Sequence, residues 1–387
     1  MVGGKLRMLV AGGLLVAAFP VLIGCGERAN GGEPRPVATE DPGLSEAEAR
    51  VRCIKADRER LQAELRANGG WRGWYEKLDP FCKDMLELVK AARKEDKEAK
   101  VVSGKGGQLA PLEGLLRQCA DLRSLGQTDG AAAKDWSSVT TTVDLSNQLW
   151  GKGIDLIVVP IPAKFELLPE EFSDSVPEST ATTLVRHRYM LALLEQDVEV
   201  IDIFPALAAA KAQGEAVYLA TDSHWTDQAM RIAAGLIAER IERYEAVRDH
   251  ARVDYKTEEV VYRYRSPLLK GFLTPEEQEA FPLVEDPALR IIDITGEPYD
   301  AANHPYSPVL LFGDSYMMTK RPGSTFAAHL AHAARMPVSA LFQFFVTRDG
   351  VRMLARKGAE YLEHRRVVVW FMNSRGFATE WRPAKLP

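Results

Sequence analysis

The residues of this chain whose types and spacing best suit chemistry are Asp222, His224 and Ser315. A serine hydroxyl becomes a useful nucleophile when a base takes its proton, and an imidazole is such a base when a carboxylate fixes its tautomer. His224 stands two residues after Asp222 and directly before Trp225, in the segment "TDSHWT". In an extended segment, positions i and i+2 point to the same side. This spacing therefore predicts that Asp222 and His224 act together.

The segment "LLFGDSYMM" (310–318) places Ser315 where a nucleophile would be accessible. An apolar run ends at Gly313, and glycine permits a tight turn at that point. Ser315 would then stand at the carboxyl end of a buried strand, as nucleophiles do on strand-to-helix turns. Asp314 is expected to brace the turn. Gly-Asp-Ser by itself is a common sequence, so an ordinary polar turn is the alternative.

The scaffold that must position these residues is predicted from short apolar runs separated by helical patterns. Uninterrupted apolar runs suit parallel strands that helices cover on both faces, and sites in such α/β folds lie at the carboxyl ends of the strands. Thr226 is expected to cap the helix after His224, with Asp227 in its first turn. The strands are expected at 153–162, 198–204, 308–315 and 366–372, and the helices at 136–151, 183–196, 226–247, 324–335 and 350–363.

The N-terminus has the pattern of an export signal. Two basic residues, Lys5 and Arg7, precede the apolar run 8–23, which is shorter than the roughly 20 residues that span a bilayer as a helix. Residues 22–25, "LIGC", resemble a bacterial lipoprotein box, which implies cleavage before Cys25 and a lipid on its thiol. A plain signal peptide with an accidental Cys25 is the alternative. We predict a lipid-anchored periplasmic protein, and Gly26 favours the outer membrane.

The chain divides into four predicted parts. Residues 26–44 are rich in glycine, proline and charge, as flexible tethers are. Two helical patterns follow, interrupted by Asn68-Gly69-Gly70, and they predict a helical hairpin. The parts are a signal peptide (1–24), a tether (25–44), a helical extension (45–98) and an α/β domain (99–387).

Composition and cysteine content limit the classes of protein. The chain has 387 residues, 46% of them hydrophobic, and a net charge of −5, which gives no sign of nucleic-acid binding. In an oxidising compartment, Cys53 and Cys82 are the preferred disulfide pair, since they lie on neighbouring helical patterns, and Cys119 would be a buried thiol. No Cys-x-x-Cys motif suggests zinc or redox chemistry.

Together, Asp-x-His-Trp and the later Gly-Asp-Ser resemble the SGNH-hydrolase-like domain of alginate O-acetyltransferases of the AlgX and AlgJ type. The resemblance implies an SGNH-hydrolase-like, flavodoxin-like parallel sheet flanked by helices. In that family the aspartate and histidine precede the serine, and they do so here. The further landmarks are "VVSGKGGQL" (101–109), which lacks the family's tryptophan, "IDLIVVPIPAKFELLPEEF" (154–172) and "VVVWFMNSRGF" (367–377).

The resemblance implies acyl transfer without a cofactor. His224 would deprotonate Ser315, which would carry an acetyl group to a hydroxyl of an exported polysaccharide, and a membrane-bound O-acyltransferase would supply that group. The backbone N–H groups of Ser315 and Tyr316 are the predicted oxyanion donors. Further expected oxyanion or substrate-binding residues are Gln343, Asn373, Arg375, Lys164 and Trp225, with Lys164 and Arg375 holding a polymer carboxylate.

Three other readings use parts of the same pattern. A polysaccharide acetyl esterase would use the same three residues, and a non-catalytic polysaccharide-binding lipoprotein would keep only the fold. A metallophosphoesterase also contains Asp-x-His and Gly-Asp, but its additional histidine and asparagine blocks are not in the sequence. His329 and His332, three residues apart on a predicted helix, would be its candidate metal pair.

Overall fold

A computed structural model describes residues 44–95, 97, 99–112, 114, 116, 119, 136–176, 184–265, 274–279, 283–317, 321–342, 346–377 and 380–387. The predicted signal peptide, the lipidation site Cys25, nearly all of the tether and the candidate Gln343 lie outside these residues.

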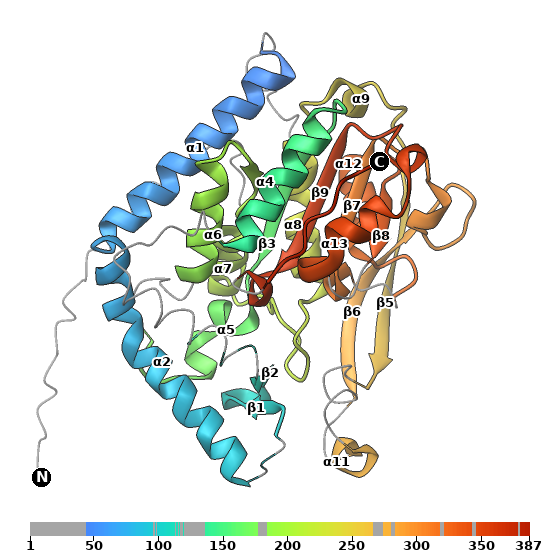
Figure 1. Ribbon diagram of the computed structural model, residues 1–387. Coiled ribbons are helices and arrows are strands. Elements are labelled where there is room, and N and C mark those ends of the chain that lie inside the picture. Colours follow the sequence, from blue (N-terminus) through green and yellow to red (C-terminus); the bar gives the residue numbers. More distant parts are fainter. Residues whose placement is uncertain are drawn as a thin grey trace, which may run out of the picture.

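The centre of the molecule is a five-stranded parallel sheet with the order β4-β3-β9-β7-β8 (Figure 1). The predicted α/β class is thus confirmed. Three strands, β3, β7 and β9, are buried along their whole length, which is why they are apolar apart from Asp155 at the start of β3 and Asn373 at the end of β9. The strands are β3 (Asp155–Ile161), β4 (Glu199–Val200), β7 (Val309–Gly313), β8 (Ser339–Phe342) and β9 (Val367–Asn373).

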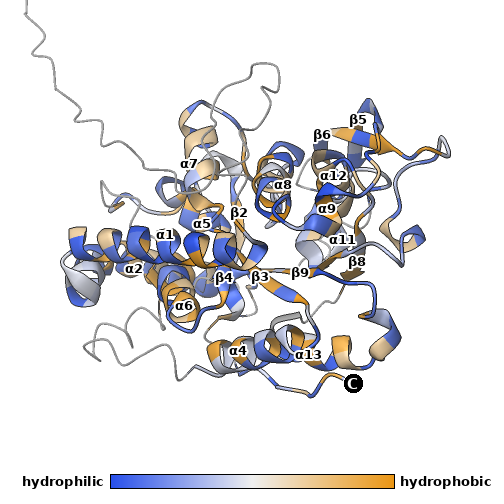
Figure 2. Ribbon diagram, turned by 90° about the horizontal axis from the view of Figure 1, so that it is seen from above, coloured by the Kyte–Doolittle hydropathy of each residue, from blue (hydrophilic) through white to orange (hydrophobic). Residues whose placement is uncertain are grey.

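Two layers of helices cover the sheet, and successive residues of its strands alternate between them. In β9, Val368 and Trp370 pack with one layer, whereas Val369 and Phe371 pack with the other. Figure 2 shows α4 and α13 on one side of β3 and β9, and α8 and α12 on the other. The first layer contains α4 (Ser137–Trp150), α6 (Leu184–Leu194) and α13 (Val346–Ala355), and the second contains α7 (Phe204–Ala212), α8 (Asp227–Ile241) and α12 (Phe326–Ala334).

The predicted and observed helices differ mainly at their ends. As expected, Thr226 caps α8 by accepting a hydrogen bond from the backbone of Ala229. The helix predicted at 350–363 ends at Ala355, because Gly358 has a φ of 84° and breaks the pattern. Within the described ranges the remaining short helices are α5 (Lys164–Leu167), α9 (Glu245–Arg248), α11 (Pro275–Glu279) and the 3₁₀ turns η1 (Lys105–Gly107), η3 (Pro169–Glu171), η5 (Ala301–Asn303), η6 (Ser315–Met317), η7 (Ala359–Tyr361) and η8 (Ser374–Gly376).

Two antiparallel pairs lie outside the main sheet and were not predicted. β1 (Val101–Ser103) pairs with β2 (Leu109–Pro111), close to the carboxyl end of β3. β5 (Lys256–Tyr264) pairs with β6 (Val284–Ile292) over nine residues each and forms a ribbon that extends away from the sheet (Figure 1).

The predicted N-terminal helices are α1 (Glu46–Ala67) and α2 (Gly70–Glu95), which we call the arm. They diverge from a bend at Gly69 and Gly70, both with positive φ, so the arm is open rather than closed as a hairpin (Figure 1). The expected Cys53–Cys82 disulfide is not formed: Cys82 packs in the core beneath α2, whereas Cys53 lies beside Arg240 of α8. Among the described helices, none has the length and apolar character needed to cross a bilayer.

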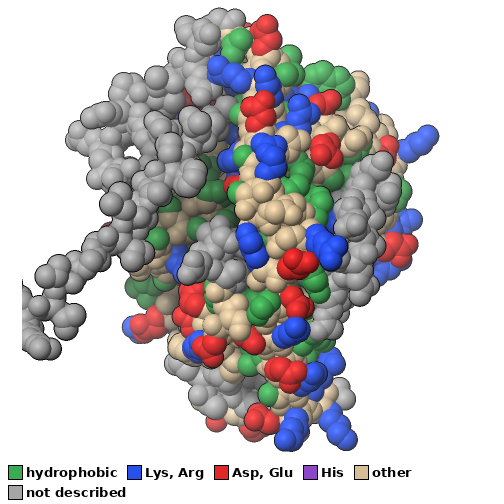
Figure 3. All heavy atoms as spheres, turned by 90° about the vertical axis from the view of Figure 1, so that its left-hand side faces the viewer, with side chains coloured by type: hydrophobic (Ala, Val, Ile, Leu, Met, Phe, Trp, Pro, Cys, Tyr) green, Lys and Arg blue, Asp and Glu red, His purple; other side chains and the backbone are tan. Residues whose placement is uncertain are grey.

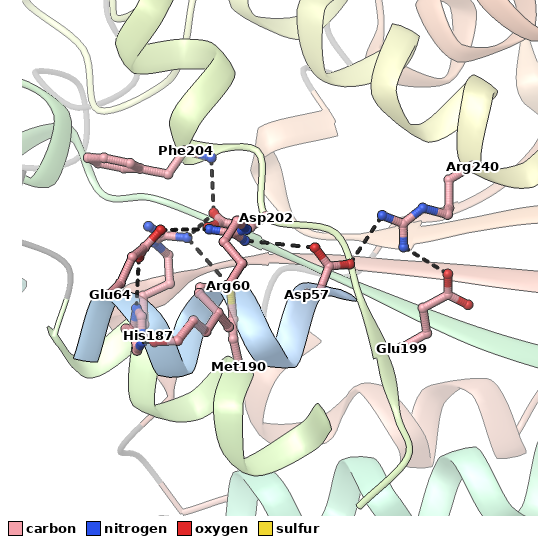
Figure 4. Close-up of polar contacts among 11 residues, drawn as sticks. Asp57, Arg60, Glu64, His187, Met190, Glu199, Asp202, Phe204 and Arg240 are labelled. Atoms are coloured by element: carbon pink, nitrogen blue, oxygen red, sulfur yellow. Dashed lines mark hydrogen bonds and ion pairs between the residues drawn. The ribbon is translucent and has the colours of Figure 1, made fainter. Parts of the chain in front are cut away.

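A buried network of charges attaches the arm to the sheet (Figure 4). Arg60 of α1 forms an ion pair of 3.1 Å with Asp202, which follows β4. Arg186 of α6 binds the other oxygen of Asp202 at 2.5 Å. Asp57 of α1 contacts Arg240 of α8 at 3.2 Å. On the outer side of the molecule, basic and acidic side chains are interspersed (Figure 3). The arm is therefore a packed part of the domain on its inner side and a solvated surface on its outer side.

Gly313, the last residue of β7, has no room for a side chain. A Cβ at this position would lie 2.5 Å from the ring of Phe371 in β9. Gly313→Ala is therefore expected to lower the free energy of unfolding by about 1–3 kcal/mol, as overpacked core substitutions do. Gly235→Ala is the matched control, because a Cβ there has nothing within 4 Å and alanine favours α8 by roughly 0.5–1 kcal/mol. Denaturant unfolding of both variants tests this, and equal stabilities would contradict the expected crowding.

Candidate active site

The candidate nucleophile is presented by the turn that follows β7. The strand ends at Gly313, Asp314 turns the chain, and Ser315 begins the 3₁₀ turn η6. The Asp314 carboxylate accepts hydrogen bonds from the backbone N–H of Tyr316 at 3.0 Å and of Asn373 at 3.4 Å. Asp314 thus ties the turn to the end of β9, the bracing function that the sequence indicated.

Asp222, His224 and Ser315 lie in a hydrogen-bonded row. His224 Nδ1 is 2.7 Å from Asp222 Oδ1, and His224 Nε2 is 2.9 Å from Ser315 Oγ. With the Nδ1 proton donated to the carboxylate, Nε2 is left to accept the serine proton. Both Asp222 and His224 are buried. This arrangement is able to activate the hydroxyl of Ser315.

The Asp222 carboxylate is held in its charged form. Burial alone would raise its pKa, but hydrogen bonds from the side chain and backbone of His224 hold the pKa below its ordinary value. The backbone N–H of His224 donates to Asp222 Oδ1 at 3.1 Å, in addition to the ring contact. Because both bonds come from the same residue, the ring orientation and the local turn are fixed together.

Two aromatic residues join the base segment to the nucleophile turn. The indole N–H of Trp225 donates to the backbone carbonyl of Tyr316 at 2.9 Å, and the Tyr316 hydroxyl donates to the carbonyl of Ser223 at 2.7 Å. Trp225 is completely buried and stacks on Phe326. The expectation that Trp225 binds substrate is therefore wrong. The backbone N–H of Tyr316, an expected oxyanion donor, is instead bonded to Asp314.

Asn373 and Arg375 form a closing turn (residues 373–375) beside the nucleophile turn. Asn373 Oδ1 accepts from the backbone and the Nε of Arg375, at 3.1 and 2.7 Å, and its amide donates to the carbonyl of Pro162 at 3.4 Å. The Asn373 side chain is thus used within the turn. The Arg375 side chain is partly exposed, and its charge acts on Asp314. Arg375 remains the better side-chain candidate for contact with substrate.

Lys164, an expected ligand of the substrate, and His329, a candidate metal ligand only under the metallophosphoesterase alternative, both have other partners. Lys164 is only 2% exposed, and its ammonium donates to backbone carbonyls, so it does not hold a polymer carboxylate. His329 of α12 lies 2.7 Å from Asp227 of α8 rather than forming a metal pair with His332. Within the described part of the chain, no group of three or more His, Cys, Asp or Glu residues could hold a metal ion.

Sequence reasoning missed a buried group near the base. Arg321 forms an ion pair with Asp286 of β6 and donates to the hydroxyl of Tyr264 of β5 at 2.8 Å. Burial, only partly offset by Arg321, raises the pKa of Asp286 to about 6, and Asp222 contributes to this rise. No local motif marks these residues, because they meet only through the unpredicted ribbon.

Comparisons with known proteins show which families and folds this chain resembles. Residues 98–370 match the family described as "SGNH hydrolase-like domain, acetyltransferase AlgX". A probable alginate O-acetylase AlgJ of Pseudomonas putida is 25% identical over 197 residues, 48% of this chain and 49% of that protein. The Azotobacter vinelandii AlgJ is 32% identical over 88 residues, 23% of this chain and 22% of that protein. The matches thus span less than half of the length of these relatives.

Two solved structures share the fold. The O-acetyltransferase domain of Pseudomonas putida AlgJ superposes with a TM-score of 0.54 at 21% identity, covering 73% of this chain and 93% of that chain. Pseudomonas aeruginosa AlgX superposes with a TM-score of 0.51 at 16% identity, covering 73% of this chain and 64% of that chain. At these identities the likeness establishes the architecture.

Proposed function

Because the chain belongs to the family of AlgX-type, SGNH hydrolase-like acetyltransferase domains, we propose that it is an O-acetyltransferase that acts on a polysaccharide. The observation that carries this proposal is the row of Asp222, His224 and Ser315, with contacts of 2.7 and 2.9 Å. A serine activated in this way can hold an acetyl group as an ester between donor and acceptor.

The reaction would take place in two similar halves. His224 Nε2 takes the proton of Ser315 as its Oγ attacks the acetyl carbonyl, and the proton then passes to the leaving group. In the second half, a sugar hydroxyl gives its proton to His224, attacks the ester and releases Ser315, which recovers the proton. Asp222 stabilises the imidazolium in both halves. An oxyanion donor contributes about 3 kcal/mol, and the candidates are the backbone N–H of Ser315 and the side chain of Arg375.

The proposal also covers the acceptor polysaccharide, the acetyl donor and the location of the protein in the cell. The curated relatives are named as probable alginate O-acetylases, which supports an anionic polysaccharide as the acceptor. The resemblance suggests a membrane-bound O-acyltransferase as the acetyl donor. The N-terminal pattern supports export to the periplasm and lipid anchoring at Cys25. Water competes with the sugar for the same ester, so the acetyl esterase is the alternative activity.

The test is the intact mass of the full-length protein, in detergent, after exposure to an activated acetyl ester. We expect a transient acetyl adduct on Ser315 that an anionic oligosaccharide removes with acetylation of the sugar. Ser315→Ala should form no adduct. Discharge to water only, with a range of oligosaccharides, would favour the esterase. Equal ester turnover in wild type and Ser315→Ala, without an adduct, would contradict both activities.

A further inference from the structure

We infer that Lys164 is a positioning residue: its buried side chain holds the base loop, residues 219–224, at the geometry in which His224 can activate Ser315. The inference rests on the proposed function in one respect, that the activated Ser315 is the nucleophile of the reaction. The geometry of the base can be measured without a substrate.

The side chain of Lys164 ends among four backbone carbonyls. Its Nζ donates to those of Leu109 (3.0 Å), Leu219 (2.7 Å), Ala220 (2.5 Å) and Asp222 (2.9 Å). Three of the four belong to the base loop, and the last is the carbonyl of the proposed orienting acid itself. An ammonium has three N–H donors, so the four oxygens share its hydrogen bonds.

The same contacts tie the base loop to a neighbouring strand. Leu109 belongs to β2, and its backbone N–H donates to the carbonyl of Ala220 at 2.8 Å. Lys164 bridges the same two segments through its ammonium. The loop is thus held by a charged group at its centre and a strand at its side. Without Lys164, three loop carbonyls would lose a partner, and those of Leu219 and Asp222 would lose a buried one, which is costly.

The backbone places Lys164 at this position directly. It is the first residue of α5, which begins three residues after the end of β3, at the edge of the sheet where the site lies. Two residues further on, the buried Glu166 accepts from Ser374 at 3.1 Å, and Ser374 lies in the closing turn. The helix α5 therefore contacts the base loop with one side chain and the closing turn with another.

The surroundings of Lys164 fit a side chain held by backbone carbonyls rather than a ligand for solvent-borne anions. Burial, partly offset by the charges of Asp222 and Glu171, lowers the pKa of Lys164 to about 7. Carbonyl dipoles replace the water around the ammonium, and they belong to β2 and to the base loop. A polymer carboxylate would have to reach a side chain that is 2% exposed.

Lys164→Met tests the inference, because methionine keeps an unbranched side chain and removes every donor. The low-field proton resonance of the Asp222–His224 hydrogen bond, identified by its loss in His224→Ala, reports the geometry of the base. The reaction rate of Ser315 with a sulfonyl fluoride reports activation. We expect Lys164→Met to lose or broaden the resonance and to react about 10- to 100-fold more slowly, the scale of a 1 Å misplacement.

Lys211→Met is the matched control. The ammonium of Lys211, in α7, donates at 2.7 Å to the carbonyl of Leu167, the last residue of α5, and forms an ion pair with Glu170. Removing it perturbs α5 on its other side and should change neither the resonance nor the rate. A folded Lys164→Met protein with both properties of the wild type would overturn the inference.

A second variant tests the inference if Lys164→Met does not fold. Lys164→Gln keeps two N–H donors without the charge, and we expect intermediate losses of the resonance and the rate. A folded Lys164→Gln protein with wild-type properties would overturn the inference. A wild-type protein that shows the resonance but never forms a Ser315 adduct would contradict the proposed function instead, and the resonance in the variants would still decide the role of Lys164.

Discussion

Asp222→Asn is expected to lower the rate of Ser315 acylation by about 10⁴-fold while leaving the fold intact, as loss of the orienting acid does in serine enzymes. The asparagine amide has the shape of the carboxylate but offers N–H donors as well as an oxygen. His224 Nδ1, which lies 2.7 Å from a carboxylate oxygen, would then accept a hydrogen bond from the amide N–H instead of donating one. In that tautomer Nε2 carries the proton, so it cannot take another from Ser315.

The chain contains its own control for this substitution. Asp227 is also buried, and its Oδ1 lies 2.7 Å from His329 Nε2, but among the described residues the other ring nitrogen of His329 has no hydrogen-bond partner, serine or other. Asp227→Asn should therefore affect stability and leave the acylation rate close to that of the wild type. Stopped-flow acylation by an activated ester, with thermal unfolding of each variant, measures both effects. Equal losses of rate in the two variants would contradict the assignment of Asp222 as the orienting acid.

The strands that could be predicted from the sequence are those buried on both faces along their whole length. β3, β7 and β9 are enclosed on both faces, so all their positions except the terminal Asp155 and Asn373 are apolar or glycine, and this pattern is recognisable in the sequence. β8 has only four residues of alternating burial and was not predicted. The ribbon of β5 and β6 was missed for a second reason: 19 residues separate its strands, and β5 is largely exposed, so neither a turn nor an apolar pattern marks it.

In the site, too, contacts between residues close in the sequence were predictable, and contacts between residues far apart in the sequence were not. Asp222 and His224 were found because two residues of spacing suffice to bring a carboxylate and an imidazole together. Lys164 was misassigned because its partners are backbone carbonyls, which every residue has and no sequence pattern marks. Trp225 was misassigned for a related reason. An aromatic residue beside a base suggests a substrate contact, whereas here its indole N–H holds the neighbouring turn at Tyr316.

The attachment of the arm gives the second large expected effect. Asp202 accepts from Arg60 of α1 at 3.1 Å, from Arg186 of α6 at 2.5 Å and from the backbone of Phe204 at 3.1 Å (Figure 4). Asp202→Ala would leave the guanidinium of Arg186, which is 1% exposed, without this partner. Removing one member of a buried ion pair costs about 3–5 kcal/mol, and we expect a loss of unfolding free energy of this size.

The exposed pair of Glu87 and Lys90, 2.5 Å apart and about 70% exposed, is the control, and Glu87→Ala should cost less than about 1 kcal/mol.

The pH dependence of stability tests the contribution of the Asp202 charge. Burial would raise the pKa of Asp202, but Arg186 and Arg60 hold it well below its ordinary value. Such a depressed pKa stabilises the fold fully above about pH 4, the usual value for aspartate, and the stabilisation is lost as pH falls below it. Urea unfolding between neutral pH and pH 3 should therefore show a smaller acid loss in Asp202→Ala than in the wild type. Parallel curves would show that the Asp202 carboxylate is not what holds the arm to the sheet.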